Sequence, residues 1–217
     1  MDRQAERSGR TRQHILEAAE QIFAEKGLDG ARVDEIAALS GANKRMIYAY
    51  FGSKEELYRI VLERIYRRLS EWERFLTDSP EGGQQDVRAA LASLVRAYFT
   101  FLRENPSYVR MLMWENLYEA RHFDAMELGK VRDPLRRALR ALLEQGKREG
   151  RFRADADEQQ VLMTLFACPF NFFSNIHTMS RVMQTDLSAD GMIEARAEAV
   201  IDMMLAYLAA DGKRALQ

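Results

Sequence analysis

Residues 32–57 read RVDEIAALSGANKRMIYAYFGSKEEL, and this stretch decides the fold. Its apolar spacing predicts two short helices, over 33–39 and 44–51, which a tight turn separates. Gly41 lies in that turn, where the backbone requires a positive φ angle, and Asn43 precedes the second helix as its expected N-cap. Two helices joined in this way are typical of a helix-turn-helix motif.

The rest of the chain also predicts helices. Its 217 residues include only four Pro and 12 Gly, and strong helix formers dominate between them. After the motif, Ser53 and Glu56 have the spacing of a capping box at the start of a longer helix. The predicted fold class is therefore all-α. We expect about nine helices, over 11–26, 33–39, 44–51, 53–76, 84–103, 106–120, 124–148, 157–184 and 190–210.

Composition excludes several classes of protein. The formal net charge of −1 excludes a uniformly basic coat for nucleic acid, and a hydrophobic content of 47% excludes a mainly disordered chain. The single cysteine, Cys168, cannot form an intramolecular disulfide, and we expect it to be a buried, inert thiol. His14, His122 and His177 are scattered, so we expect no metal site and no cofactor. Because no apolar run of about 18 residues occurs, we expect a soluble, cytoplasmic protein without a membrane partner.

The second helix of the motif carries side chains suited to DNA. In a helix-turn-helix this helix enters the major groove, and its first turn faces the base edges. Lys44 and Arg45 lie in that turn, and such cations hydrogen-bond to guanine. Tyr48 and Tyr50 are able to hydrogen-bond to phosphates, and Lys54 lies at a helix N-terminus, which itself attracts phosphate.

Local charge favours the same interpretation. Residues 41–54 contain three basic residues and no acidic one, and residues 3–12 contain four Arg and one Glu. Charge clusters alone are more often solvated helix faces. Their combination with the turn glycine, the helix spacing and the capping box favours a DNA-binding surface.

Residues 11–57 resemble the N-terminal region of the TetR family of bacterial transcriptional regulators. The residues that carry the resemblance are 15–19, 23–27, 35–37 and 47–57. The chain length and the expected number of helices are also similar to those of the family. The resemblance implies a homodimer that binds a palindromic double-stranded DNA operator, usually as a repressor, and that responds to a small-molecule effector.

The resemblance also implies roles for individual residues. It places the first turn of the second motif helix against bases, and the aromatic and basic residues after it, together with Thr11, against the DNA backbone. The family often has Ser or Thr at the position of Arg32, which cannot cap the following helix but is able to reach a phosphate. Arg45 stands where the family often has a small residue or Pro, and it adds a cation to the turn. The predicted DNA-contacting residues are Thr11, Arg32, Asn43, Lys44, Arg45, Met46, Tyr48, Tyr50 and Lys54.

The chain is expected to divide into two domains. Residues 9–69 would form the DNA-binding domain, with the helix-turn-helix at about 32–51. Residues 70–217 would form a larger helical domain for ligand binding and dimerisation.

Two helices of the second domain suggest the dimer interface. The predicted helix 157–184 is apolar nearly all round, and Pro169 should kink it. Helix 190–210 has a single apolar stripe. These helices would form a four-helix interface between two subunits; alternatively, both close the core of one subunit.

Segment 107–116 is rich in Met and aromatic residues, which suit apolar ligands of varied shape. Each such residue taken alone is more often ordinary core. Through residues 105–106 and 113–116, the C-terminal half also resembles, more weakly, the RutR-type branch of the family. The candidate ligand-binding residues are Phe99, Trp114, Tyr118, Phe170, Asn171, Phe173, Asn175 and His177.

No familiar catalytic motif occurs, since the chain lacks GxSxG, a Walker loop and HExxH. We therefore expect a regulator rather than an enzyme. Two other hypotheses stay open: a helical small-molecule-binding protein or enzyme with an incidental helix-turn-helix, and a dimeric protein-interaction module without specific DNA binding. A turnover assay or a failure to retain genomic DNA would identify the first, and an absence of salt-dependent DNA binding would identify the second.

Overall fold

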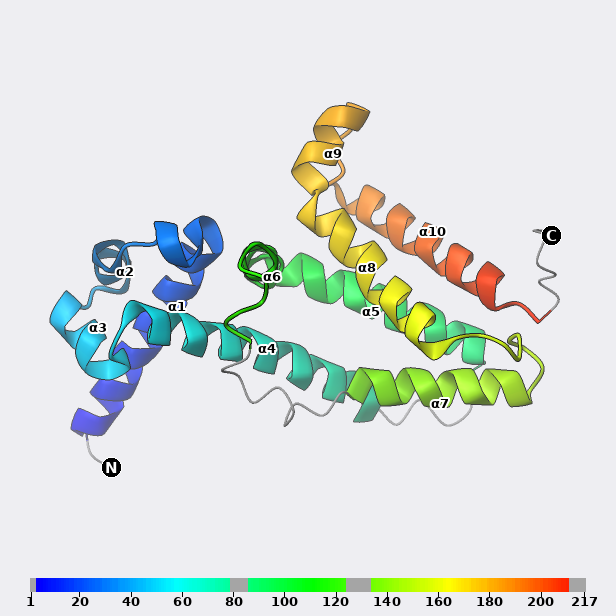
Figure 1. Cartoon of the computed structure of the whole chain (residues 1–217), viewed down its shortest axis with the longest axis horizontal. Coiled ribbons are helices and arrows are strands. Elements are labelled where there is room, and N and C mark those ends of the chain that lie inside the picture. Colours follow the sequence, from blue (N-terminus) through cyan, green and yellow to red (C-terminus); the bar gives the residue numbers. More distant parts are fainter. Residues whose placement is uncertain (1–2, 79–85, 124–133, 211–217) are drawn as a thin grey trace. The chain divides into compact units, whose positions relative to one another are not determined.

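The computed structural model describes residues 3–78, 86–123 and 134–210, and these residues form ten helices and no β-strand (Figure 1). The all-α prediction is confirmed. None of the described helices is both long enough and apolar enough to cross a membrane. The helices are α1 (Arg3–Gly30), α2 (Val33–Ser40), α3 (Lys44–Phe51), α4 (Lys54–Asp78), α5 (Val87–Glu104), α6 (Pro106–Leu117), α7 (Pro134–Arg148), α8 (Glu158–Ser174), α9 (Ile176–Met183) and α10 (Asp190–Leu208).

One predicted helix is in fact two. The expected helix 157–184 is interrupted at Asn175, whereas Pro169 lies inside α8. The backbone N–H and the side-chain amide of Asn175 both donate to the carbonyl of Asn171, each at 3.1 Å. The backbone of Asn175 leaves the helical conformation, with a φ of −109° and a ψ of 8°, so α8 ends there and α9 begins at the next residue.

Other boundaries shift by smaller amounts. Helix α1 begins at Arg3 rather than near Thr11. Helix α6 ends at Leu117 rather than near 120, because Glu119 and Ala120 have positive φ angles of 57° and 58°. The first part of the predicted helix 124–148 lies outside the described residues.

The described chain forms two compact units. Helix α4 continues from the first unit into the second after Leu69. The first unit also takes in α6, although the sequence analysis assigns all of 70–217 to one domain. The first unit contains residues 3–69 and 106–123, and the second contains residues 70–78, 86–105 and 134–210.

An apolar core holds helices α1 to α4 together in the first unit. The ring of Phe23 packs edge-on against that of Tyr58, with 5.0 Å between the ring centroids. The core holds α3 through Ile47 and Phe51 and leaves its other face exposed. The buried residues include Ile15, Ala19, Phe23, Ile36, Ile47, Phe51, Leu57, Tyr58, Val61, Leu62 and Ile65.

Helix α6 is attached to α1 at Gly27, whose φ of 66° and ψ of −178° interrupt α1. A Cβ atom at Gly27 would lie 2.8 Å from the Trp114 ring and 2.8 Å from the Tyr118 hydroxyl oxygen. The indole N–H of Trp114 donates to the carbonyl of Ala24 (3.3 Å), and the backbone N–H of Asp29 donates to the Tyr118 hydroxyl (3.4 Å). Side chains of α6 and the turn after it therefore satisfy backbone groups beside the interruption.

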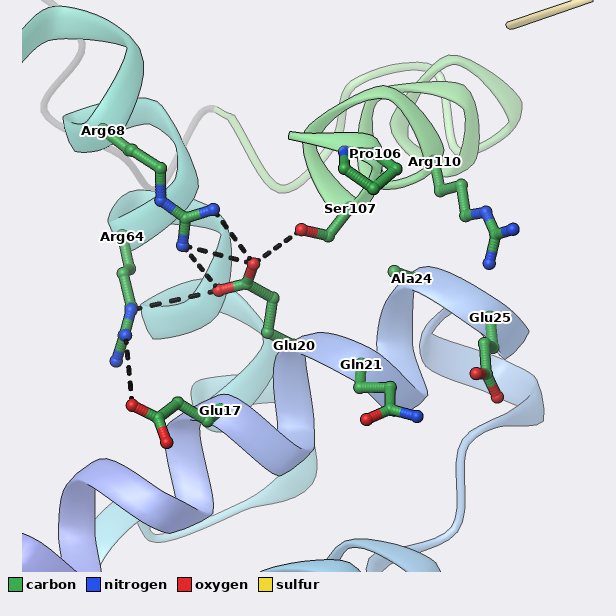
Figure 2. Close-up of a pocket in the computed structure, with 10 residues that line it drawn as sticks. All are labelled: Glu17, Glu20, Gln21, Ala24, Glu25, Arg64, Arg68, Pro106, Ser107 and Arg110. Atoms are coloured by element: carbon green, nitrogen blue, oxygen red, sulfur yellow. Dashed lines mark hydrogen bonds and ion pairs between the residues drawn. The ribbon is translucent and has the colours of Figure 1, made fainter. Parts of the chain in front are cut away.

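A carboxylate makes a second connection within this unit. Figure 2 shows a cleft of about 370 Å³ among α1, α4 and α6, with Glu20 among the residues that line it. Arg68 donates to both oxygens of Glu20 (2.9 and 3.1 Å), and the hydroxyl of Ser107 donates to one of them (2.6 Å). Arg64 lies 3.9 Å from the other oxygen. One carboxylate thus connects three helices.

These contacts control the ionisation of Glu20. Burial opposes the charged form, but the hydrogen bonds from Arg68 and Ser107 and the charges of Arg68 and Arg64 outweigh it. Together they hold the pKa of Glu20 below its ordinary value of 4.5.

A buried polar cluster connects α4 to α6. Glu115 is only 1% exposed, and its Oε1 accepts a hydrogen bond from the hydroxyl of Tyr58 (2.7 Å). The Nδ1 atom of His122 lies 2.9 Å from the same oxygen. Burial and the hydrogen bond to Glu115 raise the pKa of Tyr58, which therefore stays a neutral donor at physiological pH.

In the second unit, α5 packs against α7, α8 and α10. Arg96 of α5 also pairs with Glu198 of α10 at 2.6 Å. The apolar stripe of the last helix lies in the core of this unit, which is the alternative to its use between two subunits. The buried core includes Val87, Leu91, Val95, Phe99, Leu139, Leu143, Phe152, Val161, Leu165, Ile193, Ala197, Val200, Ile201, Met204 and Leu208.

Gly27→Ala is expected to destabilise the protein by about 1–3 kcal/mol, because it forces a side chain into a left-handed backbone and against Trp114. Urea unfolding measures the change. Gly9→Ala is the matched control, since a Cβ there meets open space within α1, and its stability should stay equal or rise slightly. Equal losses in both variants would contradict the proposed contact.

Stability should also depend on the charge of Glu20. Because its folded pKa is lowered, its stabilising effect is present above the unfolded pKa and is lost as pH falls through the folded pKa. Glu20→Gln is expected to lower the unfolding free energy at pH 7 by about 1–3 kcal/mol and to flatten its fall below about pH 4.5. Glu17→Gln is the control, since Glu17 is exposed and lies 3.9 Å from Arg64. An unchanged slope in Glu20→Gln would rule out this linkage.

Candidate nucleic-acid interface

Helix α3 is set on the first unit by an N-cap and two buried side chains. The Oδ1 atom of Asn43 accepts a hydrogen bond from the backbone N–H of Met46 (2.9 Å), which confirms the predicted cap. Gly41 has a φ of 69° in the turn before it. Ile47 and Phe51 face the core, so the first turn of α3 has a defined orientation.

The opposite face of α3 is exposed and carries no acidic residue. The ammonium of Lys44 lies 3.1 Å from Asp34, and both side chains are at least half exposed. Such a surface pair contributes little, so it exchanges readily for a contact with DNA. Arg45 is exposed and makes no hydrogen bond or ion pair with any residue that the structure describes. Tyr48 is 43% exposed on the same helix.

The start of α1 is tied to the end of α3 by contacts that the sequence did not predict. The hydroxyl groups of Ser8 and Tyr50 are 2.9 Å apart, and the guanidinium of Arg12 lies 5.4 Å from the centre of the Phe51 ring. The hydroxyl of Thr11 donates to the carbonyl of Arg7 (3.0 Å), one turn earlier. Ser8 and Arg12 lie about 40 residues before their partners in the sequence, so the sequence alone gives no sign that they contact α3.

Lys54 lies at the start of α4, and two of the N–H donors of its ammonium are already engaged within the protein. Its ammonium donates to the carbonyls of Leu28 (2.8 Å) and Ala31 (3.3 Å), at the end of α1. An ammonium has three N–H donors, so one is left for a phosphate.

Next to Lys54, one half of the predicted capping box forms. The backbone N–H of Glu56 donates to Ser53 Oγ at 3.0 Å. The carboxylate of Glu56 bonds Arg59 Nε (3.1 Å) instead of returning to Ser53. Arg32 precedes α2 without a side-chain cap, as predicted, and is exposed.

The candidate ligand residues fall in both units. Trp114 and Tyr118 belong to the first unit, where their polar atoms are bonded to α1. In the second unit the structure brings Phe99 and Phe173 together, with 5.9 Å between their ring centroids. Phe172, which the sequence analysis omitted, lies 6.1 Å from Phe99.

The remaining candidates lie on or near the end of α8. Phe170 and Asn175 are half-buried, and Asn171 and His177 are exposed. In the part of the chain that the structure describes, no cluster of three or more His, Cys, Asp or Glu side chains is arranged to hold a metal ion.

Comparison with known proteins identifies the type of molecule that carries these features. Residues 15–61 match the family model described as bacterial regulatory proteins of the tetR family, and residues 88–204 match the tetracyclin repressor-like C-terminal domain. The transcriptional repressor NicS of Pseudomonas putida is 33% identical over 185 residues, which cover 85% of each chain.

Solved structures are similar along most of the chain. The regulator SCO4942 of Streptomyces coelicolor superposes with a TM-score of 0.62 and 27% identity, covering 89% of this chain and 96% of that one. FadR of Bacillus subtilis, solved with stearoyl-CoA, has a TM-score of 0.63 and 17% identity over 90% of this chain and 98% of its own. Members of the matched family regulate transcription and are not enzymes. The chain is therefore a DNA-binding transcriptional regulator that belongs to the TetR family.

Proposed function

We propose that the protein is a cytoplasmic homodimer that represses transcription from a palindromic operator, and that a small, largely apolar effector releases it. The observation that carries the DNA-binding part is the acid-free face of α3. Its cap at Asn43 and its buried Ile47 and Phe51 fix the helix, while Arg45 and Tyr48 stay exposed. A rigid helix with uncommitted donors suits the major groove.

The proposed dimer uses the exposed face of α8 and α10 in the second unit. Met163 is 63% exposed, Met203 50% and Tyr207 44%, and a groove of about 360 Å³ lies beside them. Cys168 lines this groove and is half-buried rather than buried as expected. Contiguous apolar surface of this kind is normally covered, and a second copy would cover it with the same two helices.

A palindromic operator follows from that symmetry. Two copies of α3 would read half-sites whose centres lie roughly 34 Å apart along the DNA. Binding of one half-site raises the effective concentration of the second α3 at the other. An effector that changes the separation of the two helices by a few ångströms would remove that advantage.

The effector part of the proposal rests on the second unit. Phe99 and Phe173 are the candidate ligand residues that the structure brings together there, although Phe99 also belongs to the buried core, while Trp114 and Tyr118 are already bonded to α1. The individual lining residues stay a prediction. An effector needs only a different affinity for the DNA-bound and free conformations.

Selection of genomic fragments by the purified protein at moderate salt tests the proposal as a whole. Sequencing of the retained fragments should recover one palindrome. Recovery of random fragments alone would exclude a specific regulator.

Substitutions should separate base contacts from phosphate contacts. Arg45→Ala is expected to cost about 1–3 kcal/mol on the operator and little on random DNA. Lys54→Ala is expected to weaken both alike and to reduce the slope of log K against log salt by about one. Fluorescence anisotropy at several salt concentrations measures both effects. Arg148→Ala, an exposed change on α7, is the control. The assignment fails if Arg45→Ala and Lys54→Ala give the same pattern.

Met203→Arg should convert the dimer to monomers at micromolar concentration, because it places a charge in the proposed apolar interface. Analytical ultracentrifugation measures the mass, and operator affinity should fall in parallel. Leu117→Arg is the matched control, since Leu117 is 72% exposed at the end of α6, outside this face. A variant Met203→Arg that stays dimeric would remove α10 from the interface.

A further inference from the structure

Helix α10 carries a second stripe of residues, which points away from the core of its unit. Met192, Ala195, Ala199 and Met203 recur at helical spacing on this side. Ala195 and Ala199 are exposed, and Met203 is 50% exposed. Because alanine side chains are short, another helix is able to approach α10 closely at the middle of this outward stripe.

Two grooves lie along the outward side of α10 and meet at its middle. The first has a volume of about 380 Å³, and residues 192–199 of α10 line it together with α9 and the end of α8. The second is the groove of about 360 Å³ described above, to which α10 contributes residues from 200 to 208. Ala199 is therefore the last residue of α10 in the first groove, and the second groove begins at the next residue.

One cation lies on this apolar side of the helix. Arg196 is the only basic residue of α10, and it is half-buried in the first groove. It makes no hydrogen bond or ion pair with any residue that the structure describes, and none of the residues lining either groove is acidic. A guanidinium that is partly removed from water without an acceptor is costly, because its N–H donors lose hydration.

One anion of the same helix also lacks a counter-ion. Three of the four acidic residues of α10 lie 2.6–3.9 Å from arginines of α5, and the closest pair is Glu198 with Arg96. The fourth, Asp202, is exposed and forms no hydrogen bond or ion pair within the described part of the chain. One cation and one anion of α10 are thus available to another molecule.

We infer that α10 packs antiparallel against α10 of a second copy, across a two-fold axis at Ala199, and that Arg196 pairs with Asp202 of the partner subunit. Arg196 lies three residues before Ala199, and Asp202 lies three residues after it. In two antiparallel helices related by a two-fold axis, residues equally far from the axis on opposite sides lie level with each other. The ion pair therefore forms twice, once on each side of the axis.

The same register matches the shapes of the two surfaces. Ala195 and Met203 each lie four residues from Ala199, so a short side chain of one subunit faces a long one of the other. The first groove of each subunit then faces the second groove of the other. The exposed methionine is able to fill this space, because its unbranched side chain adapts to irregular gaps.

Other positions of the axis do not give Arg196 an acceptor. An axis at Ala195 would set Arg196 level with Glu194, whose carboxylate faces Arg103 of α5. An axis at Met203 would set it level with Ala210, which has no acceptor in its side chain. Among the exposed residues of the outward stripe, only Ala199 sets the cation level with an unpaired acid.

The inference rests on the dimer of the proposed function and deepens it. It names the register and the charges by which the helix selects a second copy of this chain. The dimer itself does not depend on this particular register, so the two ideas are able to fail separately.

Exchange of the two charges tests the register in the full-length protein. Sedimentation equilibrium should show that Arg196→Asp and Asp202→Arg each raise the dimer dissociation constant about tenfold, because like charges then face each other twice. An equimolar mixture of the two variants should form heterodimers, in which both pairs are again opposite in charge. The doubly substituted protein should recover the wild-type constant to within about threefold. Arg148→Asp, an exposed change on α7, should leave it unchanged.

Cross-linking locates the axis independently of charge. With Cys168 replaced by serine, Ala199→Cys should give a covalent dimer on mild oxidation with copper phenanthroline. A residue on the axis faces its own copy, and a disulfide requires Cβ atoms about 4 Å apart. Ala195→Cys is the matched control and should stay uncross-linked, since it would face Met203 of the partner subunit. Thermal unfolding checks that every variant is folded.

The outcomes separate the inference from the function on which it rests. If the mixture forms no heterodimers, or if Ala195→Cys cross-links and Ala199→Cys does not, the register is wrong. The repressor dimer still stands in that case if the wild type is dimeric and retains a palindrome. A wild type that is monomeric and retains no palindrome would overturn both.

Discussion

The backbone of Gly27 is the constraint on which the first unit depends. Its φ of 66° and its missing side chain let the Trp114 ring approach α1 more closely than any other residue would allow. The interruption also places the carbonyls of Leu28 and Ala31 where Lys54 reaches them from the start of α4. Side chains of both α4 and α6 therefore bond to α1 or to the residue after it close to this interruption.

Helix caps and helix faces that depend only on neighbouring residues were predictable from the sequence. The apolar stripe of α1 and the cap at Asn43 each lie within one or two helical turns, so spacing alone reveals them. The exposed, acid-free face of α3 follows from the same local pattern.

Features that depend on distant residues were not predictable in this way. Nothing near Trp114 indicates that its indole bonds Ala24, and nothing near Glu20 indicates its partners Arg68 and Ser107. The end of α8 at Asn175 is local, but the apolar pattern continues past it and predicts one helix to 184 with a kink at Pro169. The same limit applies to the ligand residues, because an aromatic side chain looks alike in a core and in a binding site.

The two tryptophans give each compact unit its own optical reporter. Trp114 lies at the hydrogen-bonded junction of α1 and α6, while Trp72 packs against Phe101 in the second unit, with 5.0 Å between ring centroids. Indole emission responds to hydrogen bonding and to polarity. A variant that keeps only one of the two tryptophans would therefore report on one unit alone. The protein thus carries, without any added label, the means to record whether a change begins among the DNA-binding helices or in the helices that follow them.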